Sequence, residues 1–308
     1  MPKDFISIAD WSRAEILAML ERARELKDLQ KRGERPQTLQ GRTLAMYFEK
    51  PSLRTHVTFE AGMTQLGGHA LTLLPDQVGI GTRETPADVA RNLSRWVDVI
   101  LARTFSHSLV EELARVASIP VINGLTDLLH PCQVMADLLT ISERAELSRA
   151  RLAYVGDGNN VANSLLNAAA VLGLEFRFAT PESHRPAYRV RRRAEELAAA
   201  SGARISFTVD PVAAVRSADF IYTDVWTSMG QEDEAEQRRA FFEPYQVNAR
   251  LVRHAPEAFV MHCLPAHRGE EITDEVLDGP RSIVFDQAEN RLHAQKAILE
   301  RLLLGPRS

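Results

Sequence analysis

The chain has 308 residues, of which 45% are hydrophobic, so it can bury more than one core and we expect two domains. Its 37 basic and 41 acidic residues leave a net charge of -4 without a long basic run, which argues against nucleic acid or an anionic membrane surface as a partner. Two distant cysteines, Cys132 and Cys263, argue against a structural zinc site or a disulfide framework. With no apolar run of membrane-spanning length, we expect a soluble, cytoplasmic protein.

Strands and helices alternate along the first half of the chain. A helix from Ser12 to about Arg32 opens with a capping box, and its predicted buried face holds Ile16, Leu17, Leu20, Ala23 and Leu26. We then expect a strand at 43–48, a helix at 52–67, a strand at 69–74 and a polar loop at 75–85. These are followed by a helix at 86–96, a strand at 97–102, a helix with a capping box at Ser108 and Glu111, a strand at 119–122 and a helix at 131–144.

The same alternation restarts after a charged stretch at 143–149. It predicts a strand at 152–155, a helix ending at 172, a strand at 175–179, an Arg-rich helix at 187–200, strands at 205–209, 220–223, 259–262 and 283–285, and an amphipathic helix at 289–304. This pattern indicates an α/β fold of two doubly wound parallel-sheet domains joined by interdomain helices. We expect one domain at 1–144, with the C-terminal helix 289–308 packing back on it, and a second domain at 145–288.

The joint between the strand at 43–48 and the following helix is a candidate anion site. At a helix start the first N–H groups lack an intrahelical partner and the helix dipole is positive. Ser52 and Thr55 add hydroxyl donors, and Arg54 adds a planar fork suited to a phosphate or carboxylate. The alternative is an ordinary helix capped by Ser52 with Arg54 in solvent.

Polar clusters follow most of the predicted strands, and in open α/β sheets ligands bind beyond these carboxyl ends. The clusters are Ser52-Leu53-Arg54-Thr55, Arg103, His130-Pro131-Cys132-Gln133, Gly156-Asp157-Gly158-Asn159-Asn160, Asp224 to Gly230 and His262-Cys263-Leu264-Pro265. The glycine loop at 156–160 lacks the third glycine of a dinucleotide fingerprint, because Val161 stands there, which argues against NAD.

Two residues of these clusters suggest specific chemistry. His130, next to a helix start, could donate to a carbonyl oxygen that gains negative charge, with Gln133 one turn away. Cys263 follows an apolar strand, where a buried inert thiol is the default interpretation. Strand alternation points His262 to the opposite face, so we do not expect a papain-like Cys/His pair.

Together these clusters resemble, in order and spacing, the motifs of the aspartate/ornithine carbamoyltransferase family, and the resemblance covers nearly the whole chain. Leu53 stands where the family usually has threonine, and His56 where an arginine is often found. The resemblance implies a carbamoyl phosphate site made of Ser52, Leu53, Arg54, Thr55, Gln77, Arg103, His130, Pro131, Cys132, Gln133, Cys263, Leu264 and Arg291. It implies an ornithine site made of Asn160, Asp224, Ser228 and Met229, with Arg54, Arg103, His130 and Cys263 as catalytic residues.

The implied reaction transfers the carbamoyl group of carbamoyl phosphate to the δ-amine of L-ornithine, giving L-citrulline and phosphate in arginine metabolism, with arginine biosynthesis as the expected pathway. It requires no metal and no cofactor. The family also implies a homotrimer or a multiple of trimers, in which Gln77 reaches a neighbouring subunit's site. Alternatives are a carbamoyltransferase for aspartate, putrescine or an acylated ornithine, a non-catalytic paralogue, and an NAD-dependent oxidoreductase.

Overall fold

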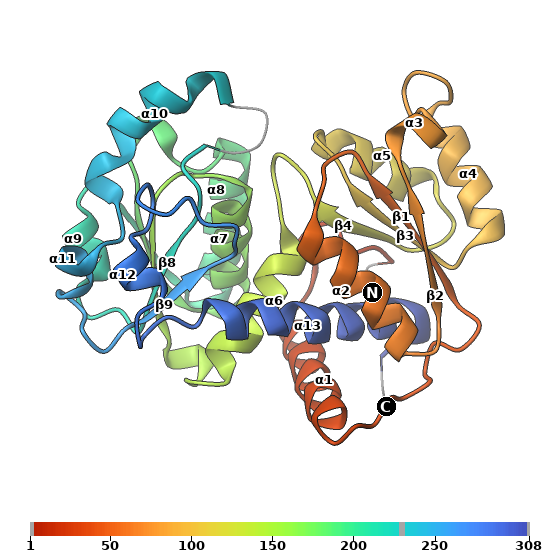
Figure 1. Ribbon diagram of the computed structural model, residues 1–308, viewed down its shortest axis with the longest axis horizontal. Coiled ribbons are helices and arrows are strands. Elements are labelled where there is room, and N and C mark those ends of the chain that lie inside the picture. The colour runs from red at the N-terminus through yellow and green to blue at the C-terminus, as the bar shows by residue number, and fades with distance from the viewer. Residues whose placement is uncertain (1–2, 228–231, 307–308) are drawn as a thin grey trace. The chain divides into compact units, whose positions relative to one another are not determined.

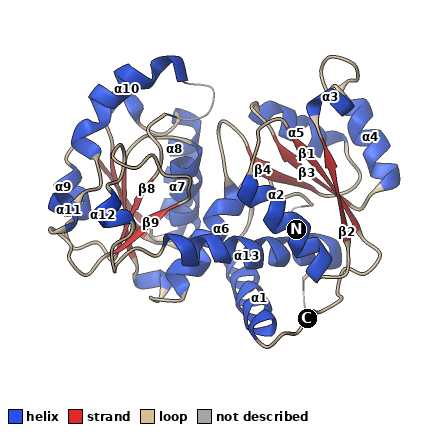
Figure 2. Cartoon of the chain, in the orientation of Figure 1, coloured by secondary structure: helices blue, strands red, loops and turns tan. Residues whose placement is uncertain are grey.

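The computed structural model describes residues 3–227 and 232–306, which divide into two compact units (Figure 1). The first unit comprises Met1–Leu139 and Glu289–Ser308, and the second comprises Thr140–Ala288. The division falls inside helix α6 (Pro131–Ser142) and inside helix α13 (Val284–Leu304), whereas we expected the first domain to end at residue 144. Each unit contains one parallel sheet with helices around it, which confirms the expected α/β class (Figure 2).

The sheet of the first unit has the strand order β2-β1-β3-β4. Its strands are β1 (Thr43–Phe48), β2 (His69–Leu73), β3 (Val99–Arg103) and β4 (Val121–Leu125). Its helices are α1 (Arg13–Lys31), α2 (Leu53–Gln65), α3 (Pro75–Val78), α4 (Pro86–Trp96) and α5 (His107–Val116), with a short 3-10 turn at Ile8–Asp10. Apolar side chains of α4 and α5 form one core with one face of this sheet.

The sheet of the second unit has the strand order β7-β6-β5-β8-β9. Its strands are β5 (Arg151–Val155), β6 (Glu175–Ala179), β7 (Arg204–Thr208), β8 (Phe220–Thr223) and β9 (Phe259–His262). Its helices are α7 (Asn160–Leu172), α8 (Tyr188–Ser201), α9 (Pro211–Val215), α10 (Ala235–Phe242), α11 (Ala249–Val252) and α12 (Asp274–Leu277), with 3-10 turns at Leu147–Arg149, Glu182–His184, Glu232–Glu234 and Glu243–Tyr245. In the part of the chain that the structure describes, no helix combines the length and apolar character needed to cross a membrane.

Several predicted details of the first unit are wrong. Leu17 is 38% exposed, because the buried face of α1 contains Met19 and not Leu17. Helix α5 begins at His107, not after Ser108, because the His107 N–H donates to Asp127 Oδ1 (3.0 Å) and this tertiary contact starts the helix earlier. The expected loop at 75–85 contains the one-turn helix α3, and β4 begins at Val121, later than expected.

The expected strand at 283–285 is also wrong. In place of this strand the structure has an isolated bridge between Ser282 and Val260 of β9, and α13 begins at Val284. Ile283 and Val284 are apolar and buried, as residues of an inner strand are, but the helix begins directly after the bridge at Ser282. A short apolar run therefore could not distinguish a strand from a buried helix start.

His293 makes the stability of the first unit depend on pH. Burial and the positive charges of Lys296, Lys27 and Lys31 lower the pKa of this histidine to about 3. The unfolded chain therefore binds a proton near pH 6.5 that the folded chain does not, and stability is lost as pH falls from 6.5 towards 3.

We expect the free energy of unfolding to fall below pH 6.5, with His293 contributing at most about 1.4 kcal/mol per pH unit. His293→Phe should flatten this slope because the titrating group is gone. Urea unfolding at pH 7, 6 and 5 measures both slopes, and an equal slope in the two proteins would contradict the assignment.

Candidate active site

In the first unit, two neighbouring strands end at the same level. Phe48 of β1 pairs with Arg103 of β3, so the turn after β1 lies beside the Arg103 side of the sheet. Ser52 then caps α2, and its Oγ accepts the N–H of Thr55 at 3.1 Å. The predicted strand, turn and helix are confirmed, and Arg54 occupies the first turn of this helix.

Buried guanidinium groups converge on Thr55. Its Oγ1 accepts from Arg103 Nη1 at 3.4 Å and from Arg291 Nη2 at 2.9 Å. Arg291 Nη1 also donates to Gln133 Oε1 at 2.5 Å, and Gln133 Nε2 donates to Asp137 Oδ1 at 2.9 Å. Side chains from β3, α2, α6 and α13 therefore form one positively charged cluster whose geometry suits a phosphate or carboxylate.

His130 precedes α6 and is buried beside this cluster. Burial is the main reason why its pKa lies well below the usual range, and the charges of Arg291, Arg103 and Arg54 lower it further. At neutral pH the imidazole is therefore uncharged. A neutral imidazole can donate one hydrogen bond to a carbonyl oxygen without transferring a proton to it.

The structure places other predicted residues of the first unit differently. Cys132 is fully buried and its thiol donates to the carbonyl of Asn123 at 3.3 Å, so the thiol is already used inside the protein. Leu53 is 74% exposed. Gln77 lies on α3, where its Oε1 accepts the N–H of its own turn at Leu74 (3.1 Å). Lys50, a charged residue whose burial no sequence pattern predicts, is buried, with its Nζ 4.3 Å from the centre of the Phe105 ring.

In the second unit, Asp224 and Cys263 follow two paired strands. Thr223 of β8 pairs with His262 of β9, so the next residues of both strands are neighbours. Cys263 Sγ donates to Asp224 Oδ1 at 2.9 Å, and Asn159 Nδ2 donates to Asp224 Oδ2 at 2.7 Å. The predicted residue Asn160 is the half-buried first residue of α7, whereas Asn159 caps that helix.

His262 holds the segment after β9 instead of acting on Cys263. Its Nδ1 accepts the N–H of Leu264 at 2.9 Å, so its Nε2 carries the proton and donates to Glu271 Oε1 at 3.0 Å. Both side chains are fully buried. Asp224, His262 and Cys263 do place possible metal ligand atoms within 4.8 Å of one another, but a metal would have to break one of these histidine hydrogen bonds.

Ser228 and Met229 lie outside the described residues. Arg238 of α10 donates from Nε to the carbonyl of Trp226 at 2.7 Å and pairs through Nη2 with Asp157 Oδ2 at 2.5 Å. Sequence reasoning missed Arg238, because nothing in a run of charged residues marks the one that turns inward. Burial raises the pKa of Asp157 to about 6 despite the opposing effect of Arg238.

Two family models match the chain. Residues 3–143 match the carbamoyl-P binding domain of aspartate/ornithine carbamoyltransferase, and residues 148–302 match its Asp/Orn binding domain. The chain belongs to the aspartate/ornithine carbamoyltransferase family. Arg291 falls within the second family match, although the residues to which it donates, Gln133 and Thr55, belong to the first structural unit.

Similar members of the carbamoyltransferase family align with nearly the whole chain. The ornithine carbamoyltransferase of Anoxybacillus flavithermus is 56% identical over 303 residues, 98% of this chain and 96% of the relative. The anabolic ornithine carbamoyltransferase of Pyrococcus furiosus is 53% identical over 305 residues, 98% of this chain and 97% of the relative. A solved ornithine carbamoyltransferase structure from Pyrococcus furiosus gives a TM-score of 0.95 at 52% identity and covers 99% of this chain and 98% of that chain.

Gly158 lets the glycine loop at 156–160 lie close to the backbone of residues 184–186. Its N–H donates to the carbonyl of His184 at 2.9 Å, and a Cβ here would lie 2.4 Å from that oxygen and 2.5 Å from the nitrogen of Pro186. These are backbone atoms, so a side chain at this position forces the loop to move.

Gly158→Ala should therefore destabilise the protein by about 1–3 kcal/mol and raise the KM for ornithine, because the displaced loop carries Asn159. Gly202→Ala is the control, since a Cβ at Gly202 meets no atom within 4 Å and only its backbone conformation, with φ at +77°, carries a cost. Thermal unfolding and steady-state kinetics measure the two effects. Equal behaviour of the two variants would contradict the close-contact argument.

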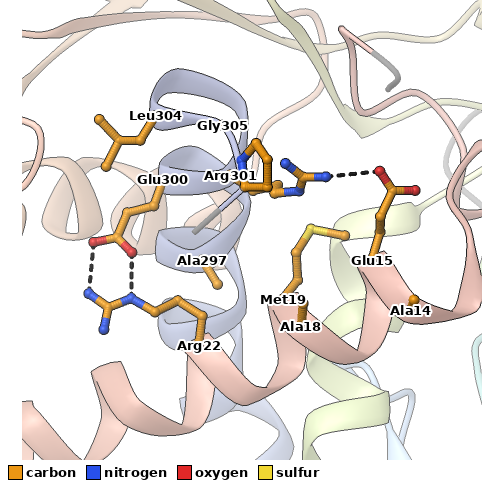
Figure 3. Close-up of a pocket in the computed structure, with 11 residues that line it drawn as sticks. Ala14, Glu15, Ala18, Met19, Arg22, Ala297, Glu300, Arg301, Leu304 and Gly305 are labelled. Carbon is orange, nitrogen blue, oxygen red and sulfur yellow. Dashed lines mark hydrogen bonds and ion pairs between the residues drawn. The ribbon is translucent and has the colours of Figure 1, made fainter. Parts of the chain in front are cut away.

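A cavity of about 240 Å³ lies between α1 and α13 in the first unit (Figure 3). Its apolar lining includes Ala14, Ala18 and Met19, and the ion pairs Arg22–Glu300 (2.5 Å) and Arg301–Glu15 (2.8 Å) join the two helices around it. None of the predicted site residues lines this cavity, so it is separate from the arginine cluster.

Proposed function

We propose that the chain is an ornithine carbamoyltransferase, which converts carbamoyl phosphate and L-ornithine to L-citrulline and phosphate. The observation that carries this proposal is the relation over 98% of the chain to proteins of that name at more than half identity. The charged groups of the two units fit it chemically. One unit presents buried cations to a phosphate, and the other presents a buried carboxylate to an ammonium group.

The arginine cluster is the proposed carbamoyl phosphate site. Arg54, Arg103 and Arg291 balance the charge of the phosphate, helped by the capped start of α2 at Ser52, Leu53 and Thr55. Neutral His130 donates to the carbonyl oxygen as it becomes negative, and Gln133 orients Arg291. Losing one such donor should lower the rate about a hundredfold, which is ~3 kcal/mol. Pro131 and the backbone of Cys132 complete the start of α6.

Asp224 is the proposed partner of the α-ammonium group of ornithine, and Asn160 the partner of its α-carboxylate. These contacts leave the uncharged δ-amine to attack the carbonyl carbon. The bond from that carbon to the phosphate oxygen then breaks, and the departing phosphate ends up with the proton that the nitrogen loses. Cys263 and Leu264 complete the set assigned to the carbamoyl group, and Ser228 and Met229 complete the ornithine site. The reaction needs neither a metal nor a covalent enzyme intermediate.

We also propose a cytoplasmic, biosynthetic enzyme that forms a homotrimer or a multiple of trimers. The anabolic name of the Pyrococcus furiosus relative supports the direction. Exposed apolar residues on α2 and on the edge strand β2, Val57 and Leu71 among them, support association of chains through this part of the first unit. Light scattering should give three chains or a multiple, and a monomeric mass would contradict it. Gln77 would then act in a neighbouring subunit.

The decisive assay offers carbamoyl phosphate with ornithine, aspartate, putrescine or acetylornithine in parallel and measures the carbamoylated product. We expect ornithine to give the highest kcat/KM. A preference for another amine would replace the acceptor, and no product with any amine would favour a non-catalytic paralogue.

A further inference from the structure

Asn159 is fixed in one orientation by the helix that it caps. Its Oδ1 accepts the N–H groups of Val161 (3.0 Å) and Ala162 (3.1 Å) at the start of α7. Only the amide oxygen can accept these hydrogen bonds, so the cap determines which end of the amide points where. The NH₂ end therefore faces away from the helix, towards Asp224.

The amide nitrogen of Asn159 then meets the carboxylate of Asp224. Nδ2 lies 2.7 Å from Oδ2, and both residues are buried, at 9% and 5% exposure, so water competes little for this hydrogen bond. The other carboxylate oxygen accepts from the Cys263 thiol at 2.9 Å. Both donors are uncharged, so they orient the carboxylate without placing a positive charge against it.

We propose that Asn159 is a positioning residue for Asp224, which it holds ready for the α-ammonium group of the amino acid substrate. This inference rests on the proposed function. Asp157, in the same glycine loop as Asn159, is bound differently, because it pairs with the guanidinium group of Arg238. A neutral donor serves Asp224 because a cation in its place would compete with the substrate's ammonium group.

The test uses the full chain and two substitutions that keep the helix cap. Asn159→Ser retains an oxygen acceptor for α7 but removes the donor to Asp224. Asn159→Asp retains the acceptor and sets a second carboxyl group against Asp224, so that the pair holds a proton at low pH and repels at high pH. Asn248→Ser is the matched control, since Asn248 caps α11 in the same unit by accepting from Leu251 (3.1 Å).

We expect Asn159→Ser to raise the ornithine KM about tenfold or more, and the carbamoyl phosphate KM less than about twofold, because a hydrogen bond to a charged group is lost. For Asn159→Asp, the ratio of its ornithine KM to that of the wild type should be larger at pH 8 than at pH 6. Asn248→Ser should leave both KM values unchanged.

An unchanged ornithine KM in Asn159→Ser, or an equal rise for both substrates, would overturn the positioning role. If that variant does not fold, the Asn159→Asp ratio decides, and a ratio independent of pH would overturn it. A wild-type chain that makes no citrulline would overturn the proposed function itself, and an active wild type separates the two failures.

Discussion

Arg54→Ala should lower kcat/KM by about a thousandfold, the loss of roughly 4 kcal/mol of transition-state stabilisation. Arg54 stands in the first turn of α2 and is one of the three arginines whose charges lower the pKa of His130. Without Arg54, less positive charge would remain at the start of α2 to balance the two negative charges of carbamoyl phosphate. Steady-state kinetics with carbamoyl phosphate varied at saturating ornithine measure this loss.

Two further variants distinguish the effect of the positive charge of Arg54 on activity from the effect of its planar shape and from a general loss of protein stability. Arg54→Lys should recover part of the activity, because an ammonium group keeps the charge but not the planar fork. Arg42→Ala is the control, since Arg42 precedes β1 at its other end and pairs with Asp98 on the surface (2.6 Å). Near-normal turnover in Arg54→Ala would remove the phosphate role.

Asp224→Ala should raise the KM for ornithine at least about a hundredfold and change the KM for carbamoyl phosphate only a few fold. The variant removes the carboxylate that the ammonium group needs and leaves the donors Asn159 and Cys263 without their acceptor. Varying each substrate at saturation of the other separates the two constants.

Asp219→Ala is the control for Asp224→Ala, because it removes the carboxylate that borders the other end of β8. Asp219 lies at the opposite end of β8, where it accepts from the N–H and guanidinium groups of Arg151. We expect this variant to unfold more easily but to keep both KM values. Equal rises for both substrates in Asp224→Ala would count against the ornithine contact.

The alternation of apolar strands and capped helices predicted the two parallel sheets, because burial and caps are local properties of the sequence. Strand ends and helix starts set by tertiary contacts could not be predicted in the same way. His107 begins α5 because Asp127 binds its N–H, and Val284 begins a helix where its apolar neighbours suggested a strand.

The candidate site was predicted where a motif follows a strand, as with Thr55, Arg103 and Asp224. The parallel register of β8 and β9 would also have placed Asp224 beside Cys263. The sequence could not show that Asn159, and not Asn160, caps α7, because the capping residue is known only when the first residue of the helix is known. Lys50 and Arg238 look like surface charges in the sequence, and only packing shows that they are buried.

The split of the first unit along the chain affects how the protein matures during synthesis. Residues 140–288 are complete as a unit before the segment from Glu289 onward has been made. That late segment supplies Arg291, which bonds Thr55 and Gln133, and Lys296, which bonds Gln30 and Gln65. Although domains usually fold in order from the N-terminus during translation, the first unit here is complete only when the ribosome has made the final helix. A message cut short before that point would encode the second unit in full and leave the first unit without Arg291 and Lys296.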